Sequence, residues 1–325
     1  MNKFPGMVLT GVGLVSPAGA SKTDFFRCLR ETSVPYQEPS RREEGEAAQL
    51  LKHLDITEPK LKIARYMDPV SKNAIVALRG ALTDAGVEES RIAEAPFEYG
   101  IVFGTTRGAC VSRERLYESL ASRQGNTLSG TIFSHCGYNI AGAMAAIAFK
   151  IKGPNLTIAG EADLGVAVLS RARQLLMSRR VHTVFAGFSE CDGTRKRRQG
   201  SSGECAYVLC LERKDKAANR GAAVLAEVRV ERVDGTRSRD QRGIVRGLHS
   251  RDALLDGGTE TLVLPLPGMK TIGDRCASLI MVGLLSHDKS LQNRFPALAF
   301  TTLAGRTPME VRVIYDGEEN TQHGL

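Results

Sequence analysis

Apolar residues in this chain gather in short runs that alternate with helix-length segments, the pattern of an α/β protein. Five runs rich in apolar and β-branched residues predict strands in the first two thirds of the chain: 7–13, 99–104, 156–160, 182–187 and 206–212. Residues 70–85 and 164–179 have the length and apolar spacing of helices. The small apolar residues of 140–149 predict a further, buried helix.

A second, shorter set of elements follows. It comprises predicted strands at 222–233, 261–265, 297–302 and 310–315, with a helix at 276–287. Residues 237–251 are rich in Arg and Asp and predict a surface connection. Because this set repeats the first in outline, we expect two related halves, residues 1–220 and a shortened 221–325.

The composition is that of a globular protein with a sizeable core. With 325 residues and 42% apolar content, the chain can bury one or two domains. No run of 18 apolar residues occurs, so no membrane helix is predicted. Lys3 and the following apolar stretch imitate a signal peptide, but Pro17 interrupts its apolar core.

Seven cysteines are scattered without the close spacing of a zinc site or a disulfide scaffold. Their pattern therefore predicts reduced thiols in a cytoplasmic protein with no bound metal. Cys205 and Cys210 lie in a strand pattern and are expected to be small buried residues.

The net charge of +8 raises the possibility of a nucleic-acid partner. The densest basic run, Arg195, Lys196, Arg197 and Arg198, precedes a Gly and Ser segment and predicts a solvated loop. Aromatic residues make up 6% of the chain, with no Trp, and none interrupts this run. Base-stacking surfaces are therefore not indicated, and an acidic protein is the alternative partner of the run.

Several short motifs, taken in order, resemble the β-ketoacyl synthase family. They include an Arg-x-Met-Asp-x-x-Ser stretch at 65–71 and a Gly-Pro-Asn turn at 153–155. The other similar segments are 7–17, 100–105, 139–143, 184–190 and 203–212. The resemblance implies an α/β, thiolase-like fold of two related halves in α-β-α-β-α layers, and no cofactor.

The chain departs from the family where chemistry is expected. Ala162 occupies the position of the family's nucleophilic cysteine. The first family histidine has no counterpart, and Asp274 lies roughly at the place of the second. The excursion that covers the family's active site is reduced to about a dozen residues after Glu190. Condensation requires a thiolate and two imidazoles, so we expect no intrinsic condensing activity.

Other groups offer alternative chemistry. Glu161 and Asp163 flank Ala162 and either cap the following helix or form a rebuilt acid-base pair. His135 and Cys136 are adjacent, but neighbours on an extended segment point to opposite faces, which argues against a catalytic dyad.

Two classes of function remain. In the first, the chain resembles a chain-length factor, a noncatalytic subunit that pairs with an active ketosynthase and shapes its acyl pocket. Its partners would be that ketosynthase and an acyl carrier protein, which would dock at Arg195–Arg198. In the second, the chain is an enzyme with a rebuilt acyl-transfer or hydrolytic site that uses Glu161 and Asp163, or Cys136. A homodimeric scaffold that binds acyl carrier proteins is a further alternative.

The resemblance also implies two structural expectations. Val184 and Phe185 lie in the strand at 182–187, which should continue the sheet into a second subunit. Phe133 and Tyr138 bound a segment, also containing His135 and Cys136, that should reach the acyl tunnel of the partner. The alternative for Phe133 is a place in the core of its own subunit.

Overall fold

The structure is a computed structural model, and it describes the chain in segments. These are residues 6–15, 67–122, 130–160, 164–191, 193, 205–232, 244–246, 252–256, 261–265, 297–301 and 309–314. From residue 231 onward the description covers the backbone only.

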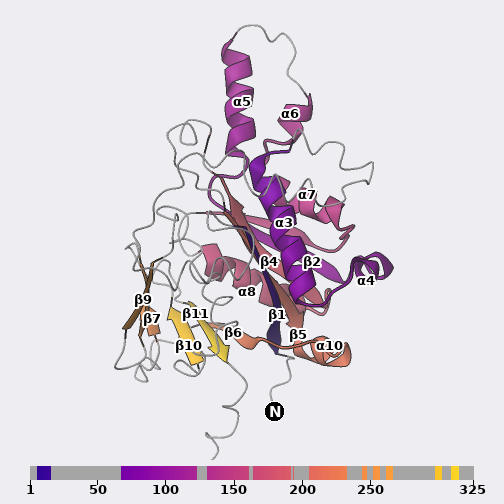
Figure 1. Cartoon of the computed structure of the whole chain (residues 1–325), viewed down its shortest axis with the longest axis vertical. Coiled ribbons are helices and arrows are strands. Elements are labelled where there is room, and N and C mark those ends of the chain that lie inside the picture. Colours follow the sequence, from indigo (N-terminus) through magenta and orange to yellow (C-terminus); the bar gives the residue numbers. More distant parts are fainter. Residues whose placement is uncertain are drawn as a thin grey trace, which may run out of the picture.

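Nine strands form one mixed sheet in the order β3-β2-β4-β5-β1-β6-β11-β10-β7 (Figure 1). The strands are β1 (Met7–Val15), β2 (Tyr99–Thr105), β3 (Asn155–Ala159), β4 (Thr183–Glu190), β5 (Cys205–Arg213), β6 (Ala226–Arg232), β7 (Ile244–Arg246), β10 (Ala297–Thr301) and β11 (Met309–Ile314). A separate two-stranded sheet pairs β8 (Asp252–Asp256) with β9 (Thr261–Pro265).

The strand directions reveal an internal repeat. In the first half, β1 and β5 are antiparallel, β5 and β4 are antiparallel, and β4 and β2 are parallel. The pairs β6–β11, β11–β10 and β10–β7 follow the same sequence of directions. The antiparallel pair β1–β6 joins the two sets. The predicted thiolase-like fold with two related halves, the second shortened, is therefore confirmed; the division at residue 220 stays a prediction.

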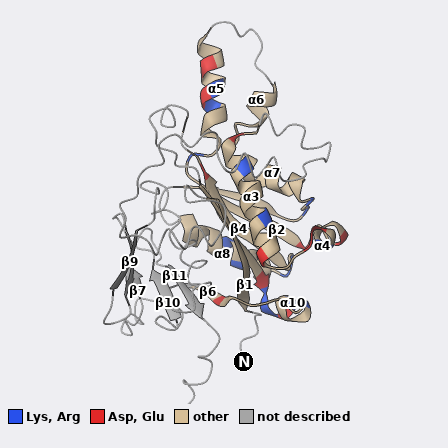
Figure 2. Cartoon of the chain, in the orientation of Figure 1, with Lys and Arg blue, Asp and Glu red and all other residues tan. Residues whose placement is uncertain are grey.

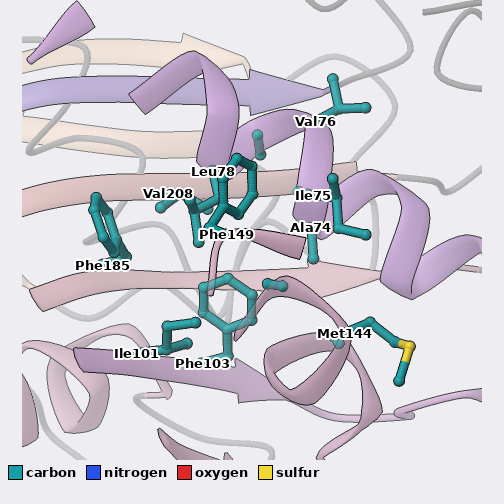
Figure 3. Close-up of a cluster of buried hydrophobic side chains, with 14 of the residues drawn as sticks. Ala74, Ile75, Val76, Leu78, Ile101, Phe103, Met144, Phe149, Phe185 and Val208 are labelled. Carbon is teal, nitrogen blue, oxygen red and sulfur yellow. The ribbon is translucent and has the colours of Figure 1, made fainter. Parts of the chain in front are cut away.

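One face of the first-half sheet is covered by α3 (Pro69–Asp84) and α7 (Ile140–Ala148). Ala74, Ile75 and Leu78 of α3 pack toward Phe103 of β2 and Phe185 of β4 (Figure 3). The close approach of α3 to β1 requires glycine, since a Cβ at Gly13 would collide with the backbone of Ala77.

The opposite face is covered by α8 (Leu164–Met177), which packs on β2 and β4. At Gly104 of β2 an added Cβ would lie 2.7 Å from the side chain of Leu164. Side chains of a strand alternate between faces, which places Gly104 against α8 while its neighbour Phe103 faces α3. The first-half sheet is thus enclosed between two helical layers.

Four shorter or peripheral helices complete the described part: α4 (Glu89–Glu94), α5 (Cys110–Ala121), α6 (Gly130–Ser134) and α10 (Lys214–Asn219). Figure 1 shows α5 and α6 at one end of the molecule, beyond the sheet. The described helices include none with the length and apolar character required to cross a bilayer.

Several boundaries and elements differ from the sequence predictions. The strand expected at 222–233 begins only at Ala226. The connection expected at 237–251 contains β7, and β8 follows directly after it. The helix α5 was not predicted, because its charged and polar residues show no apolar stripe. The helix expected at 276–287 lies outside the described residues.

Candidate functional site

The carboxyl ends of the parallel strands β2, β3 and β4 meet at one edge of the sheet. There β3 ends at Ala159, and the N–H of Gly160 donates to the carbonyl of Thr105 at 3.1 Å. Helix α8 begins at Leu164. The strand and the helix predicted on either side of position 162 are therefore confirmed. Glu161, Ala162 and Asp163 themselves lie outside the described residues, as does Asp274.

Glu190 lies buried at the end of β4 beside this edge. Its carboxylate accepts a 2.9 Å hydrogen bond from the Thr105 hydroxyl and further bonds from the N–H groups of Thr106 and Arg107. Burial raises the pKa of Glu190, although these hydrogen bonds oppose the change. The carboxylate holds the loop after β2 in place, a role that no sequence motif had indicated.

Asp68 of the Arg-x-Met-Asp motif links two helices at the same end of the sheet. Its carboxylate accepts from the N–H of Val70 at 3.1 Å and from the N–H of Ser112 at 2.7 Å. The N-termini of α3 and α5 are thus satisfied by one buried side chain. The sequence motif marked Asp68, but it did not show that a helix about 40 residues later shares the cap.

His135 and Cys136 directly follow α6, and their N–H groups donate to carbonyls three residues earlier, so the expectation of an extended segment is wrong. His135 Nδ1 donates to the carbonyl of Thr131 at 2.7 Å, and the buried Nε2 has no hydrogen-bond partner among the described residues. The thiol of Cys136 donates to the carbonyl of Ile132 at 3.2 Å, and burial raises its pKa. Each side chain bonds backbone four residues earlier, so the pair forms no catalytic dyad.

Phe133 and Tyr138 are exposed, with 65% and 48% of their surfaces accessible. No residue of α6 is buried, so the alternative that placed Phe133 in its own core is wrong. Tyr138 is positioned by Arg113, whose guanidinium lies 4.7 Å from the ring centroid. Tyr117 and Leu120 of α5 are also exposed. The α5–α6 region therefore carries several exposed apolar side chains.

Val184 and Phe185 are fully buried in β4. Both edges of β4 are already paired, one with β2 and one with β5. The expectation that this strand continues the sheet into a second subunit is therefore wrong. The edge position belongs to β3, which pairs only with β2 among the described strands.

A cavity of about 330 Å³ opens at the opposite end of the strands, beside the beginnings of β2 and β4. Its walls carry the pair His182–Glu98, at 2.7 Å, and the pair Arg220–Glu212, at 2.5 Å. Tyr99 also lines it, and burial raises the pKa of this phenol. The cavity thus lies at the opposite end of these strands from Thr105 and Gly160.

Charged residues of both signs lie side by side on α5 (Figure 2). The basic run Arg195–Arg198 falls outside the described residues, so its docking role stays a prediction.

Of the seven cysteines, the five within the described residues form no disulfide. Across the same residues, no cluster of three or more His, Cys, Asp or Glu side chains is placed to hold a metal ion.

Known proteins share the fold described above. Residues 6–202 match the family model "Beta-ketoacyl synthase, N-terminal domain". The chain belongs to the β-ketoacyl synthase family.

Among curated proteins, the chain is similar to the 3-oxoacyl-[acyl-carrier-protein] synthase 2 of Coxiella burnetii (strain RSA 493 / Nine Mile phase I). The two are 24% identical over 193 residues, which cover 58% of this chain and 46% of that protein. The match thus spans about half the length of the relative.

Two solved structures are similar over nearly the whole chain. One is a type II polyketide synthase acyl-carrier protein in complex with its ketosynthase bound to the hexaketide; the matched chain has a TM-score of 0.66 and 13% identity, covering 96% of this chain and 99% of that one. The other is the ishigamide ketosynthase/chain length factor, with a TM-score of 0.66 and 16% identity, covering 97% and 100%. At these identities the matches establish the fold.

Proposed function

We propose that this chain is a noncatalytic ketosynthase-like subunit of the chain-length-factor type. It pairs with an active β-ketoacyl-acyl-carrier-protein synthase in fatty acid or polyketide biosynthesis and shapes the acyl pocket of that partner. The proposal is supported by strand β3 and helix α8, which lie on either side of the position where the family resemblance expects the nucleophile and where the sequence has Ala162.

The absence of the nucleophile has a direct chemical consequence. Alanine offers neither a thiolate to hold an acyl group nor a donor to stabilise an oxyanion. Cys136 is a poor replacement, because its thiol is bonded to the Ile132 carbonyl and its pKa is raised by burial. This geometry gives no support to the alternative of a rebuilt site at Cys136.

Pairing through the edge strand β3 is part of the proposal. The edge of β3 that faces away from β2 pairs with no other strand among the described residues. The strand, Asn155–Ala159, contains no charged residue or proline to discourage addition of another strand. Leu156 and Ile158 are half-buried and would be covered further by a partner. The acyl carrier protein docks separately, on Arg195–Arg198.

Influence on the acyl pocket is assigned to the α6 segment. Phe133 and Tyr138 are large, apolar in part and exposed in the isolated subunit. Aromatic residues are enriched in protein–protein interfaces relative to the rest of the surface, so this exposed pair is suited to contact with a partner. In the proposed heterodimer, Phe133 reaches the acyl tunnel of the ketosynthase and limits the length of the product.

The noncatalytic assignment is tested by incubation of the pure protein with acyl and malonyl carrier-protein substrates. We expect no condensation and no mass increase. Ala162→Cys should also fail to condense, since no imidazoles accompany the new thiol. A stable acyl adduct on any residue of the natural chain would refute the assignment.

The pairing is tested by co-expression with candidate ketosynthases, followed by size and mass measurement of the complex. In the reconstituted heterodimer, Phe133→Ala should lengthen the products. Phe97→Ala is the matched control, because Phe97 is 66% exposed but lies before β2, away from α6. A homodimer that binds acyl carrier proteins and ignores every ketosynthase would favour the scaffold alternative.

A further inference from the structure

Two thiols that are 81 residues apart in sequence meet at the carboxyl ends of β2 and β4. Cys110 is the first residue of α5, and Cys191 directly follows β4. Their Sγ atoms lie 3.5 Å apart, and the Cys110 thiol donates to the backbone carbonyl of Cys191 at 3.1 Å. The sequence shows no such pair, because neither cysteine has another cysteine near it in the chain.

The surroundings of the two thiols differ in a way that suits stepwise oxidation. Cys110 is partly exposed, whereas Cys191 is fully buried. The Cys191 thiol lies 3.5 Å from the Asp68 carboxylate, which is an acceptor for its proton. An oxidant from solvent therefore meets Cys110 first, and Cys191 stands behind it as the resolving thiol.

We propose that Cys110 and Cys191 form a reversible disulfide when the protein meets a peroxide. Cys110 loses its proton to solvent, and its thiolate attacks one peroxide oxygen; the O–O bond breaks, and the departing hydroxide takes up a proton from solvent as the first water, which leaves Cys110 sulfenic acid. Asp68 then accepts the Cys191 proton. The Cys191 thiolate attacks Cys110 Sγ, the S–O bond breaks, and the departing hydroxide takes the proton from Asp68 and leaves as the second water. The two thiols lose two electrons in total, and hydrogen peroxide gains them. A dithiol reductant reverses the reaction.

The geometry requires little rearrangement for this bond. Two sulfurs at 3.5 Å must approach to about 2.05 Å, a movement of about 1.5 Å. Both residues lie at the end of an element, so the change does not break the interior of α5 or β4. The product joins the first turn of α5 to β4, next to the hydrogen bond that Asp68 makes to Ser112.

This proposal goes beyond the proposed function and does not rest on it. A disulfide at this position attaches the base of α5 covalently to the sheet. The helix carries the exposed Tyr117 and Leu120. Oxidation would therefore restrict the orientation of the α5–α6 region whether or not that region contacts a ketosynthase.

The test is peptide mapping of the full-length protein after treatment with a roughly fivefold excess of hydrogen peroxide and blocking of remaining thiols. Trypsin places Cys110 in the peptide of residues 108–113 and Cys191 in that of residues 181–195, each with one cysteine. We expect these peptides joined and about 2 Da lighter than their sum, and separated again by dithiothreitol. The unfolding midpoint should rise by about 5 °C on oxidation.

Cys110→Ser should abolish both the linked peptide and the rise in midpoint. Cys136→Ser is the matched control, since Cys136 is also partly exposed, and it should change neither. Separate peptides in the peroxide-treated wild type, further oxidation of Cys110 to sulfinic acid without a link, or a link to another cysteine would each overturn the proposal. The outcome is independent of condensing activity and of any partner.

Discussion

The carboxylate of Asp68 accepts hydrogen bonds from the first turns of both α3 and α5, yet α3 packs on the sheet and α5 projects beyond it. Beyond that turn, α3 buries ten of its 16 residues against the sheet, whereas α5 buries only Val111 and Ser112 of its 12. One helix supports the fold, and the other projects from it (Figure 1).

The two helices thus differ in the side chains they carry: those of α3 are buried in the fold, and most of those of α5 point outward. Apolar burial contributes about 25 cal/mol per Å², so the side chains under α3 dominate the free energy of unfolding. The exposed aromatic side chains near α5 contribute little to that free energy.

Phe103→Ala should lower the free energy of unfolding by about 3–5 kcal/mol. The side chain is 1% exposed and packs beneath α3 and α7. Urea denaturation followed by circular dichroism measures the change. Phe97→Ala serves as the exposed control and should change stability by less than about 0.5 kcal/mol. Equal effects of the two substitutions would contradict the assigned core.

Asp68→Ala should cost about 2–3 kcal/mol, because it leaves the N–H groups of Val70 and Ser112 without their acceptor. Hydrogen exchange should accelerate most at Ser112, since α5 has little other attachment. Asp68→Asn retains one carbonyl oxygen and should lower the free energy of unfolding by about half as much. Exchange that accelerates equally along α3 and α5 would show that the two helices are not held differently.

Glu190→Gln should alter the pH dependence of stability. Burial raises the Glu190 pKa above its ordinary value of 4.5, so the folded state retains the proton longer than the unfolded state does. The contribution of Glu190 to the free energy of unfolding is therefore greatest below about pH 4.5, and it is lost as pH rises through the raised pKa. When the pKa values of the folded and unfolded states differ by one, the loss is about 1.4 kcal/mol.

In the window that opens above about pH 4.5, wild type should consequently lose stability relative to Glu190→Gln as pH rises. Urea midpoints of both proteins, measured at several pH values across this window, supply the comparison. A constant difference between the two proteins, or one that grows in favour of wild type with rising pH, would contradict the raised pKa.

Phe133→Ala should have the smallest effect on stability, below about 0.5 kcal/mol. The ring is 65% exposed, and α6 buries nothing. The same urea titration used for Phe103→Ala measures it. A loss of several kcal/mol would return Phe133 to the core of its own subunit and remove the reason for assigning it to a partner.

Much of the first half was predictable because its elements leave local signatures. The strands β1, β2, β3 and β5 were placed within about two residues at each end, and α3 and α8 were placed almost as closely. Long apolar runs and periodic spacing arise from burial within a sheet, and they can be read without knowing the neighbours. The proline at the first position of α3 and the Asp68 cap before it belong to the same class of local signal.

Spatial neighbours could not be predicted in the same way. The sequence identified β4 as a buried strand, yet its place between β2 and β5 and the edge position of β3 follow from the order of strands in space. The helix α5 was missed because a helix that buries two residues has no periodic apolar face. The turn at His135 was misjudged for a related reason, since five helical residues are too few to establish a period.

The sequence alone determined the family resemblance and the alanine at position 162, because both depend on residue identity at positions fixed by local motifs. The tertiary structure alone brought Thr105 to Glu190 and Cys110 to Cys191, pairs separated by 85 and 81 residues. Both contacts form because β2 and β4 are parallel neighbours whose carboxyl ends coincide. That adjacency is a property of the assembled sheet and leaves no pattern in either strand.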